Sequence, residues 1–185
     1  MTVIFITLIA LIVLTLLWAV VAYNRLVRLR TQVEASWAQI HVQLKRRHSL
    51  VPNLVETVRG YATHELQTFA AVTAARQGAE HQGGDVAARA TAENALTSAL
   101  GRLIAVAEAY PQLAASASFR DLQGELANTE DKIAYARQFY NLAVQKYNGA
   151  VASVPTSLIA AVTGQRARQY FEATGEEQRD VRVQF

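Results

Sequence analysis

Residues 3–22 read VIFITLIALIVLTLLWAVVA, an unbroken run of 20 residues with no charged side chain. At about 1.5 Å of rise per residue, a helix of this length spans roughly 30 Å, the thickness of the hydrocarbon core of a bilayer. The run therefore predicts a single transmembrane helix, and it makes the lipid bilayer the expected partner of residues 3–22.

Arginines mark the side of the membrane on which the rest of the chain lies. Arg25, Arg28 and Arg30 follow the apolar run within eight residues, whereas only Met1 and Thr2 precede it. Because basic residues flank membrane helices on the cytoplasmic side, we expect the N-terminus outside and the remainder in the cytoplasm. A cleavable signal peptide would instead begin with its charged region and end at small residues. The three arginines lie within reach of anionic headgroups, which we expect them to contact.

Helical periodicity continues beyond the apolar run. Residues 26–44 carry an apolar side chain every three or four positions, which predicts that the membrane helix extends without interruption into the soluble part. Pro52 predicts a kink or a short break, after which a second helix carries apolar residues from Leu54 to Val72. The stretch 77–85, QGAEHQGGD, contains three glycines and predicts a loop.

The second half of the chain predicts further helices. A third helix carries Leu96–Tyr110 and ends near Pro111–Ala117, and Ser118 followed by Asp121 resembles the capping box that starts a fourth helix. In that fourth helix, large apolar or aromatic residues repeat every seven positions, as in a packed helical seam. They are Leu126, Ile133, Tyr140 and Tyr147.

The sequence of residues 155–185 predicts a short helix and a tail. Pro155 opens a helix through Val162, and Gly164 is placed to terminate it. Val181–Phe185 alternates apolar and polar residues, so it suits a hairpin with Tyr170-Phe171 or an extended strand on a second copy, which predicts a homo-oligomer.

The predicted fold class is therefore all-α. A single N-terminal transmembrane helix is followed by a cytoplasmic antiparallel four-helix-type bundle with a short extra helix and an extended C-terminal tail. The corresponding domains are the transmembrane helix at 1–22, the helical bundle at 23–164 and the tail at 165–185.

The residues that carry chemistry do not form a known catalytic pattern. The chain has no cysteine, and His64-Glu65 is followed by Thr68 where a zincin helix needs its second histidine. Gly83 and Gly84 lack the Lys and Ser or Thr of a P-loop, and Glu130 is expected on a solvated helix face. The sequence thus predicts no enzyme, no catalytic residue, no cofactor and no metal site.

A basic cluster, Lys45-Arg46-Arg47-His48, is the most concentrated charge in the soluble part. Four consecutive helical residues point around most of the helix, which does not suit tracking of phosphates, so no nucleic acid is expected. Two interpretations stay open: a solvated or intramolecularly paired face, and a surface for an acidic protein or a second membrane. The residues assigned to a partner surface are Lys45, Arg46, Arg47, Asn53 and Glu56.

Tyrosine is followed by asparagine at Tyr23, Tyr140 and Tyr147, the last two one heptad apart. Such polar residues in a seam can fix the register between helices through hydrogen bonds. The alternative is a pocket or partner surface.

Several segments together resemble the LemA family of bacterial membrane proteins. They include YNRLVRLRTQVEASWAQIHVQLKRRHSLVPNLVETVRGYATHE from Tyr23, TEDKIAYARQFYNLAVQKYN from Thr129 and PTSLIAAVTG from Pro155. The resemblance implies an anchor in the bacterial inner membrane, a cytoplasmic helical bundle and no established enzymatic activity. It also implies a membrane-embedded zinc metallopeptidase as a partner, and it includes a magnetosome protein.

These observations favour a non-enzymatic, membrane-anchored scaffold or adaptor that presents a helical bundle to other proteins and self-assembles. The alternative is a membrane-surface organiser that binds anionic lipid and clusters or shapes the membrane.

Overall fold

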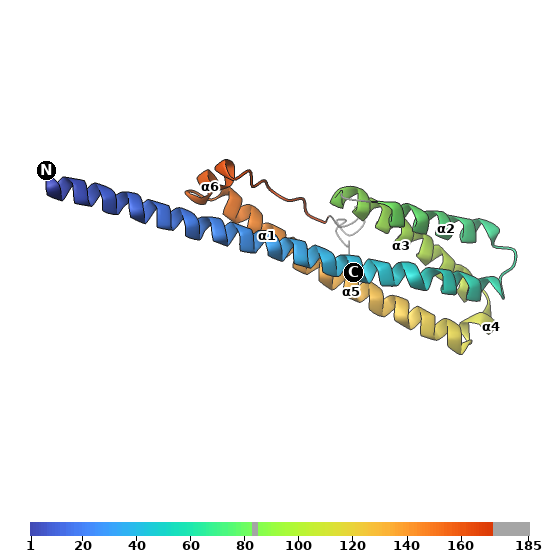
Figure 1. Cartoon of the computed structure of the whole chain (residues 1–185). Helices are drawn as coiled ribbons and strands as arrows, with labels where there is room; N and C mark the ends of the chain where they lie inside the picture. The colour runs from blue at the N-terminus through green and yellow to red at the C-terminus, as the bar shows by residue number, and fades with distance from the viewer. Residues whose placement is uncertain (83–84, 172–185) are drawn as a thin grey trace, which may run out of the picture. The chain divides into compact units, whose positions relative to one another are not determined.

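The computed structural model describes residues 1–82 and 85–171. This part of the chain folds into six α-helices and no strand, which confirms the all-α prediction (Figure 1). The helices are α1 (Thr2–Arg59), α2 (Leu66–His81), α3 (Val86–Glu108), α4 (Pro111–Ala114), α5 (Ala117–Ala152) and α6 (Thr156–Val162).

Helix α1 contains the apolar run and continues far beyond it, as the periodicity predicts. It is the one helix in the described residues that is long and apolar enough to cross a membrane, and none of its most apolar window is buried by the rest of the chain. An apolar helical surface left uncovered over this length is suited to lipid.

Of the kink or short break predicted at Pro52, the break is absent, because α1 runs through this residue and ends only at Arg59. Proline costs a helix about 3 kcal/mol, since it removes one backbone donor and crowds the preceding turn. Packing offsets this cost here: Val51, Leu54 and Val58 are all buried beside Pro52, which itself faces outward. The true end of α1 is followed by the turn 60–65, so the expected second helix is divided between the end of α1 and α2.

Contacts divide the described residues into two compact units. Unit 1 comprises residues 1–38 and 138–169, and unit 2 comprises residues 39–82, 85–137 and 170–171. Helices α1 and α5 each contribute one segment to unit 1 and another to unit 2.

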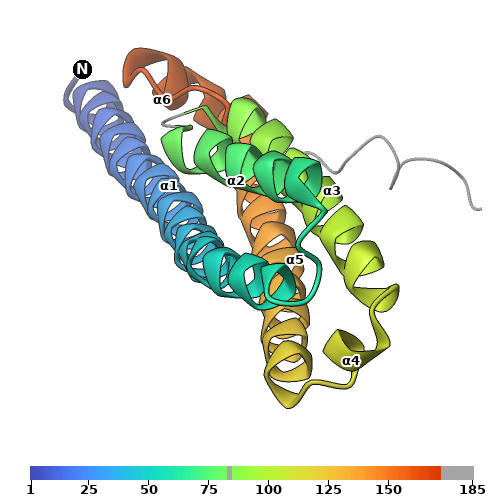
Figure 2. The ribbon, with the colours of Figure 1, turned by 90° about the vertical axis from the view of Figure 1, so that its right-hand side faces the viewer.

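Unit 2 is a helical bundle with one apolar core. Segments of α1 and α5 pack with α2, α3 and α4 around a cluster that is continuous across all five elements. Figure 2 shows α2 and α3 lying side by side, joined across the short stretch after His81. The most deeply buried members include Val58, Phe69, Leu96, Leu103 and Leu113.

The heptad series of α5 is buried as predicted. Leu126 and Ile133 are buried in unit 2, and Tyr140 and Tyr147 are buried in unit 1. A seven-residue apolar repeat keeps one stripe of a helix turned toward its neighbours, which is why the spacing alone identified these positions.

Two helix boundaries differ from those predicted from the sequence. Residues 77–81 are the last turn of α2 rather than loop, so the connection to α3 is shorter than QGAEHQGGD, and Asp85 caps α3 by accepting a hydrogen bond from the Ala87 amide at 3.2 Å. Helix α5 begins at Ala117, so Ser118 lies inside its first turn and is not the cap.

Helix α6 has the predicted limits, and Gly164 follows it with φ of 68°, the left-handed conformation that terminates helices. The strand or hairpin expected at Val181–Phe185 lies outside the described residues.

Candidate functional site

A buried ion-pair network occupies the interior of unit 2. Arg47 of α1 donates from Nη1 to Glu130 Oε1 of α5 at 2.7 Å and to Thr97 Oγ1 of α3 at 2.9 Å. Its Nη2 donates to the carboxylate of Glu93 and, at 3.2 Å, to the backbone carbonyl of the same residue. One guanidinium therefore connects three helices of the bundle.

The members of this network differ in burial. The side chains of Arg47 and Glu93 are 2% and 4% exposed, while Glu130 is 35% exposed. Burial raises the pKa of Glu93, but the hydrogen bond from His48 and the charge of Arg47 more than offset it, so the pKa lies below its ordinary value. The carboxylate is thus held ionised inside the bundle.

His48 completes the network from the neighbouring position on α1. Its Nε2 lies 3.0 Å from Glu93 Oε1 and 3.3 Å from Oε2. Its backbone carbonyl accepts a hydrogen bond from Arg76 Nε of α2 at 2.9 Å. All four long segments of the bundle consequently reach the network through polar side chains.

A cavity of about 300 Å³ opens beside this network in unit 2. Its lining carries both signs of charge, with Lys45 and Arg89 as cations and Glu80 as the anion. Burial lowers the pKa of His41 in the cavity wall, and the positive charge of Arg89 lowers it further while Glu93 acts in the opposite direction. The full lining consists of His41, Leu44, Lys45, His48, Ser49, Glu80 and Arg89.

The basic cluster predicted from the sequence is only in part a surface. Lys45 and Arg46 are exposed, and Arg46 pairs with Glu125, whereas Arg47 is buried. At about 100° per residue, Arg47 points about 200° away from Lys45 on the helix. Including Arg47 in the partner surface was therefore wrong. Asn53 and Glu56, the other members, are exposed.

The residues missed by sequence reasoning are the partners of Arg47. Glu130 was expected on a solvated face, and Glu93 was not singled out. A signal existed: Arg47 falls three residues after buried Leu44 and four before buried Val51, so it occupies a core position of the ladder. A charge at a core position implies a buried counter-charge.

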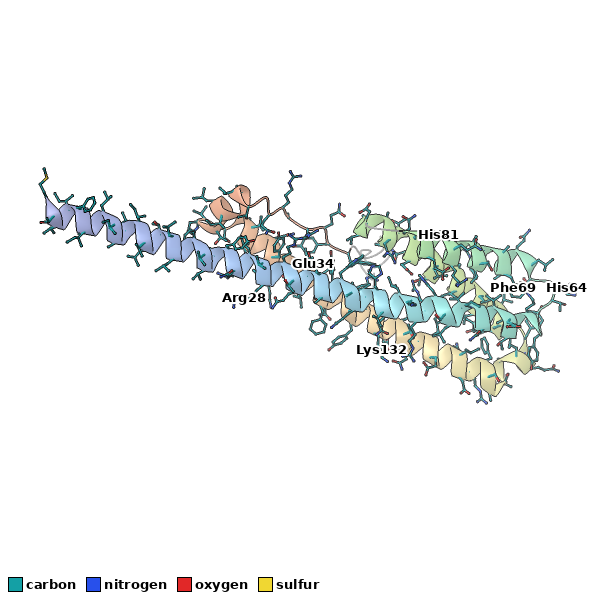
Figure 3. The ribbon with its side chains drawn as sticks, viewed as in Figure 1. Arg28, Glu34, His64, Phe69, His81 and Lys132 are labelled. Atoms are coloured by element: carbon teal, nitrogen blue, oxygen red, sulfur yellow. The ribbon has the colours of Figure 1, made fainter. Side chains whose placement is uncertain are left out.

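In unit 1, the predicted headgroup-contacting residues follow the apolar run. Arg25, Arg28 and Arg30 are all exposed, and Figure 3 marks Arg28 and Glu34 on this part of α1. Arg30 Nε donates to Glu34 Oε1 at 2.9 Å, one turn further along the helix. Arg28 also lines a groove of about 450 Å³ together with Val21, Asn24 and Val27. Headgroup contact by the three arginines stays a prediction.

Side chains of the Tyr-Asn pairs of α5 bind the segment that follows α6. The Tyr140 hydroxyl donates to the carbonyl of Gln169 at 2.9 Å, and the Tyr147 hydroxyl donates to Gln165 Oε1 at 2.8 Å. Asn148 donates to the Arg168 carbonyl at 2.9 Å and accepts from the Arg168 amide at 2.8 Å. These side chains thus hold the extended segment 165–169, and a role of the pairs in setting the register between helices stays a prediction.

Burial raises the pKa of Tyr140, and the nearby charge of Arg168 only reduces this effect. The phenol therefore stays protonated and able to donate. Its ring also packs against Trp37, with centroids 5.2 Å apart.

Within residues 1–82 and 85–171, no group of three His, Cys, Asp or Glu side chains is placed to hold a metal ion. The expectation that the protein has no metal, no cofactor and no catalytic residue stays a prediction.

Comparison with known proteins identifies relatives of this chain. MamQ 2, a magnetosome protein of Paramagnetospirillum magneticum, is 29% identical over 175 residues, and MamQ of Magnetospirillum gryphiswaldense is 25% identical over 174 residues. These matches cover 81% and 80% of the chain but only 64% of each relative. Protein LemA of Metamycoplasma hominis is 23% identical over 158 residues, which cover 85% of the chain and 72% of the relative.

The apolar segment of α1 and these relatives together identify a membrane protein. The model of the LemA family matches residues 36–185, which include the buried network, the bundle core and the residues that hold segment 165–169. Since this match covers far more than half of its length, the chain belongs to the LemA family.

Proposed function

We propose that this protein is a non-enzymatic scaffold or adaptor, fixed in the bacterial inner membrane by residues 3–22 and presenting its helical bundle to partner proteins in the cytoplasm. The proposal assigns residues 1–22 to the anchor, 23–164 to the bundle and 165–185 to the tail. It includes self-assembly of the bundle and a membrane zinc metallopeptidase as one partner.

The observation that carries the proposal is the division of α1 in unit 2 into two opposite faces. Lys45, Ser49, Asn53 and Glu56 are exposed and, at about 100° per residue, fall within an arc of roughly 80°. The opposite face carries the buried core and Arg47. One side of the helix thus holds the bundle together, and the other offers a continuous polar stripe.

The chemistry of the interior supports a structural role for its charges. Arg47, Glu93 and His48, which a catalytic site would need in contact with substrate, lie within hydrogen-bonding or ion-pairing distance of one another and are buried. Such a network ties helices together and specifies their arrangement.

Site-specific photocrosslinking in native membranes tests the proposal. A photoreactive amino acid replaces Asn53 in the outward stripe of α1, and the same residue replaces Ser98, which is exposed on α3 of the same unit. We expect discrete crosslinked proteins from position 53 and fewer from position 98. Equal patterns at both positions, or none at either, would contradict the adaptor role.

The positive charge of residues 23–59 favours a second function, that of a membrane-surface organiser. Between Tyr23 and Arg59 there are seven Lys or Arg residues against two Glu residues. Such a basic segment is attracted to anionic lipid. Reconstitution of the full chain into phosphatidylglycerol and phosphatidylcholine vesicles separates the two functions: an organiser reshapes or clusters only the anionic vesicles, and an adaptor leaves both unchanged.

A further inference from the structure

Helix α6 of unit 1 carries large apolar side chains on its outer surface. Val154, Leu158 and Val162 are 83%, 65% and 88% exposed. Val154 directly precedes the cap Pro155, and the other two lie within α6. The three residues are spaced four apart.

Within α6 this spacing places the apolar side chains on one face. At about 100° per residue, Leu158 and Val162 lie roughly 40° apart on the helix, and Ala161 adjoins them, while Val154 lies just before the helix. Ala160, on the opposite side of the same helix, is 2% exposed. Helix α6 is thus held to its unit by one side and presents an apolar face with the other.

The position of α6 within unit 1 brings this face near the membrane anchor. Figures 1 and 2 both show α6 close to the N-terminal half of α1. Ala22 and Leu26, at the end of the apolar run, are already buried in this unit, whereas Val20 and Val21 are exposed. The packed part of unit 1 therefore begins where the membrane-spanning part of α1 ends.

The charge of the same unit is one-sided. Beyond residue 22, unit 1 contains Glu34 as its acidic residue against six basic ones. The basic residues are Arg25, Arg28, Arg30, Lys146, Arg166 and Arg168. Apolar side chains combined with nearby cations are the composition of segments that lie in the interface of an anionic bilayer.

We propose that α6 is a second membrane contact, which inserts the face formed by Leu158 and Val162, together with Val154 just before the helix, into the headgroup boundary of the leaflet that α1 leaves. The groove lined by Val21, Asn24, Val27 and Arg28 lies at the same end of unit 1 and provides a basic, partly apolar place for a lipid headgroup. A spanning helix alone leaves its domain able to swivel, and a second contact fixes the orientation of unit 1 against the bilayer. This inference needs the anchor but no partner protein, so it stands or falls separately from the adaptor role.

The absence of native cysteine makes the experiment direct. Single-cysteine variants Leu158→Cys, Val162→Cys and the control Ala35→Cys are made in the full chain, labelled with an environment-sensitive fluorophore and reconstituted into phosphatidylglycerol–phosphatidylcholine vesicles. Ala35 is exposed on α1 of the same unit and lies 13 residues, or about 20 Å of helix, beyond Ala22. Lipids brominated in the acyl chain and a water-soluble quencher then report the surroundings of each label.

We expect labels at Leu158 and Val162 to be quenched by the brominated lipid and protected from the aqueous quencher, with the reverse at Ala35. Aqueous quenching equal to that of the control would overturn the proposal. Protection from both quenchers would also overturn it, because it would mean that protein, such as a second copy, covers α6.

A second set of variants tests whether the apolar face causes the contact. The label is placed on Ala161→Cys, with and without the double substitution Leu158→Gln and Val162→Gln. Loss of lipid quenching with an unchanged far-ultraviolet circular dichroism spectrum is expected, and undiminished quenching would refute the assignment of the contact to this face.

Discussion

Removing the charge of Glu93 tests the buried network, because Glu93→Gln preserves the shape of the side chain. Arg47 then keeps Glu130, Thr97 and the Glu93 carbonyl as partners but loses its buried counter-charge. Leaving a buried charge uncompensated costs about 3–5 kcal/mol. Since Glu130 partly compensates Arg47, we expect a loss near 3 kcal/mol in the free energy of unfolding.

The matched control is Glu130→Gln, which removes the other carboxylate from the same guanidinium. Because Glu130 is 35% exposed, solvent screens this ion pair and we expect a loss of only about 1 kcal/mol. Replacing the whole pair, with Arg47→Met and Glu93→Leu together, should recover most of what Glu93→Gln loses, since apolar residues of similar size replace buried ion pairs at little cost.

Urea titration of the full chain in detergent, followed by far-ultraviolet circular dichroism, measures these differences. The pKa of Glu93 is lower in the folded protein than its ordinary 4.5, so its contribution is fully present above that value and is lost as the pH falls through the folded pKa. The gap between wild type and Glu93→Gln should therefore close on acidification. A loss as small as that of Glu130→Gln at neutral pH, or a gap independent of pH, would refute the reasoning.

Three further predictions concern other parts of the structure. The pKa of His41 should lie below 6.5 in an NMR titration and should rise in Arg89→Gln, and an unchanged pKa in that variant would contradict the assigned cause. His41 should also make the fold less stable as the pH falls below 6.5, because the unfolded chain takes up the proton first. Asn148→Ala removes both hydrogen bonds to the Arg168 backbone, which together stabilise the segment by about 2 kcal/mol. Tryptic cleavage at Arg166 or Arg168 should therefore accelerate about thirtyfold, while the exposed control Gln145→Ala should have no effect. Gly164→Ala should destabilise the end of α6 by about 1–2 kcal/mol, measured by hydrogen exchange of residues 156–163, because a β-carbon disfavours the φ of 68°; unchanged exchange would contradict this.

Much of the architecture follows from periodicity in the sequence. The heptad from Leu126 to Tyr147 and the termination at Gly164 identified α5 and α6, because each depends on local spacing or on one residue's backbone preference. The local rule allowed a kink or a short break at Pro52, and the break does not occur because the buried neighbours Val51 and Leu54 stabilise the helix through contacts that are distant in sequence.

The candidate site was harder to predict, for a physical reason. Composition identifies Lys45-Arg46-Arg47-His48 as basic, but only the helical phase relative to the core separates the exposed Lys45 from the buried Arg47. The partners of Arg47 lie 46 and 83 residues away in the sequence, at distances that no local pattern encodes. In the same way, the spacing of Tyr140 and Tyr147 revealed a seam but not the segment 165–169 that their hydroxyl groups bind.

Both proposed functions require a chain held by lipid at residues 3–22 with its bundle in the cytoplasm. The most direct measurement is labelling of Ser98→Cys, an exposed position in a chain without native cysteine, by a membrane-impermeant maleimide. We predict that the protein remains in the membrane fraction after carbonate extraction and that the maleimide reacts only once the inner membrane is opened. Labelling while that membrane is intact, or release of the protein by carbonate, would contradict the account.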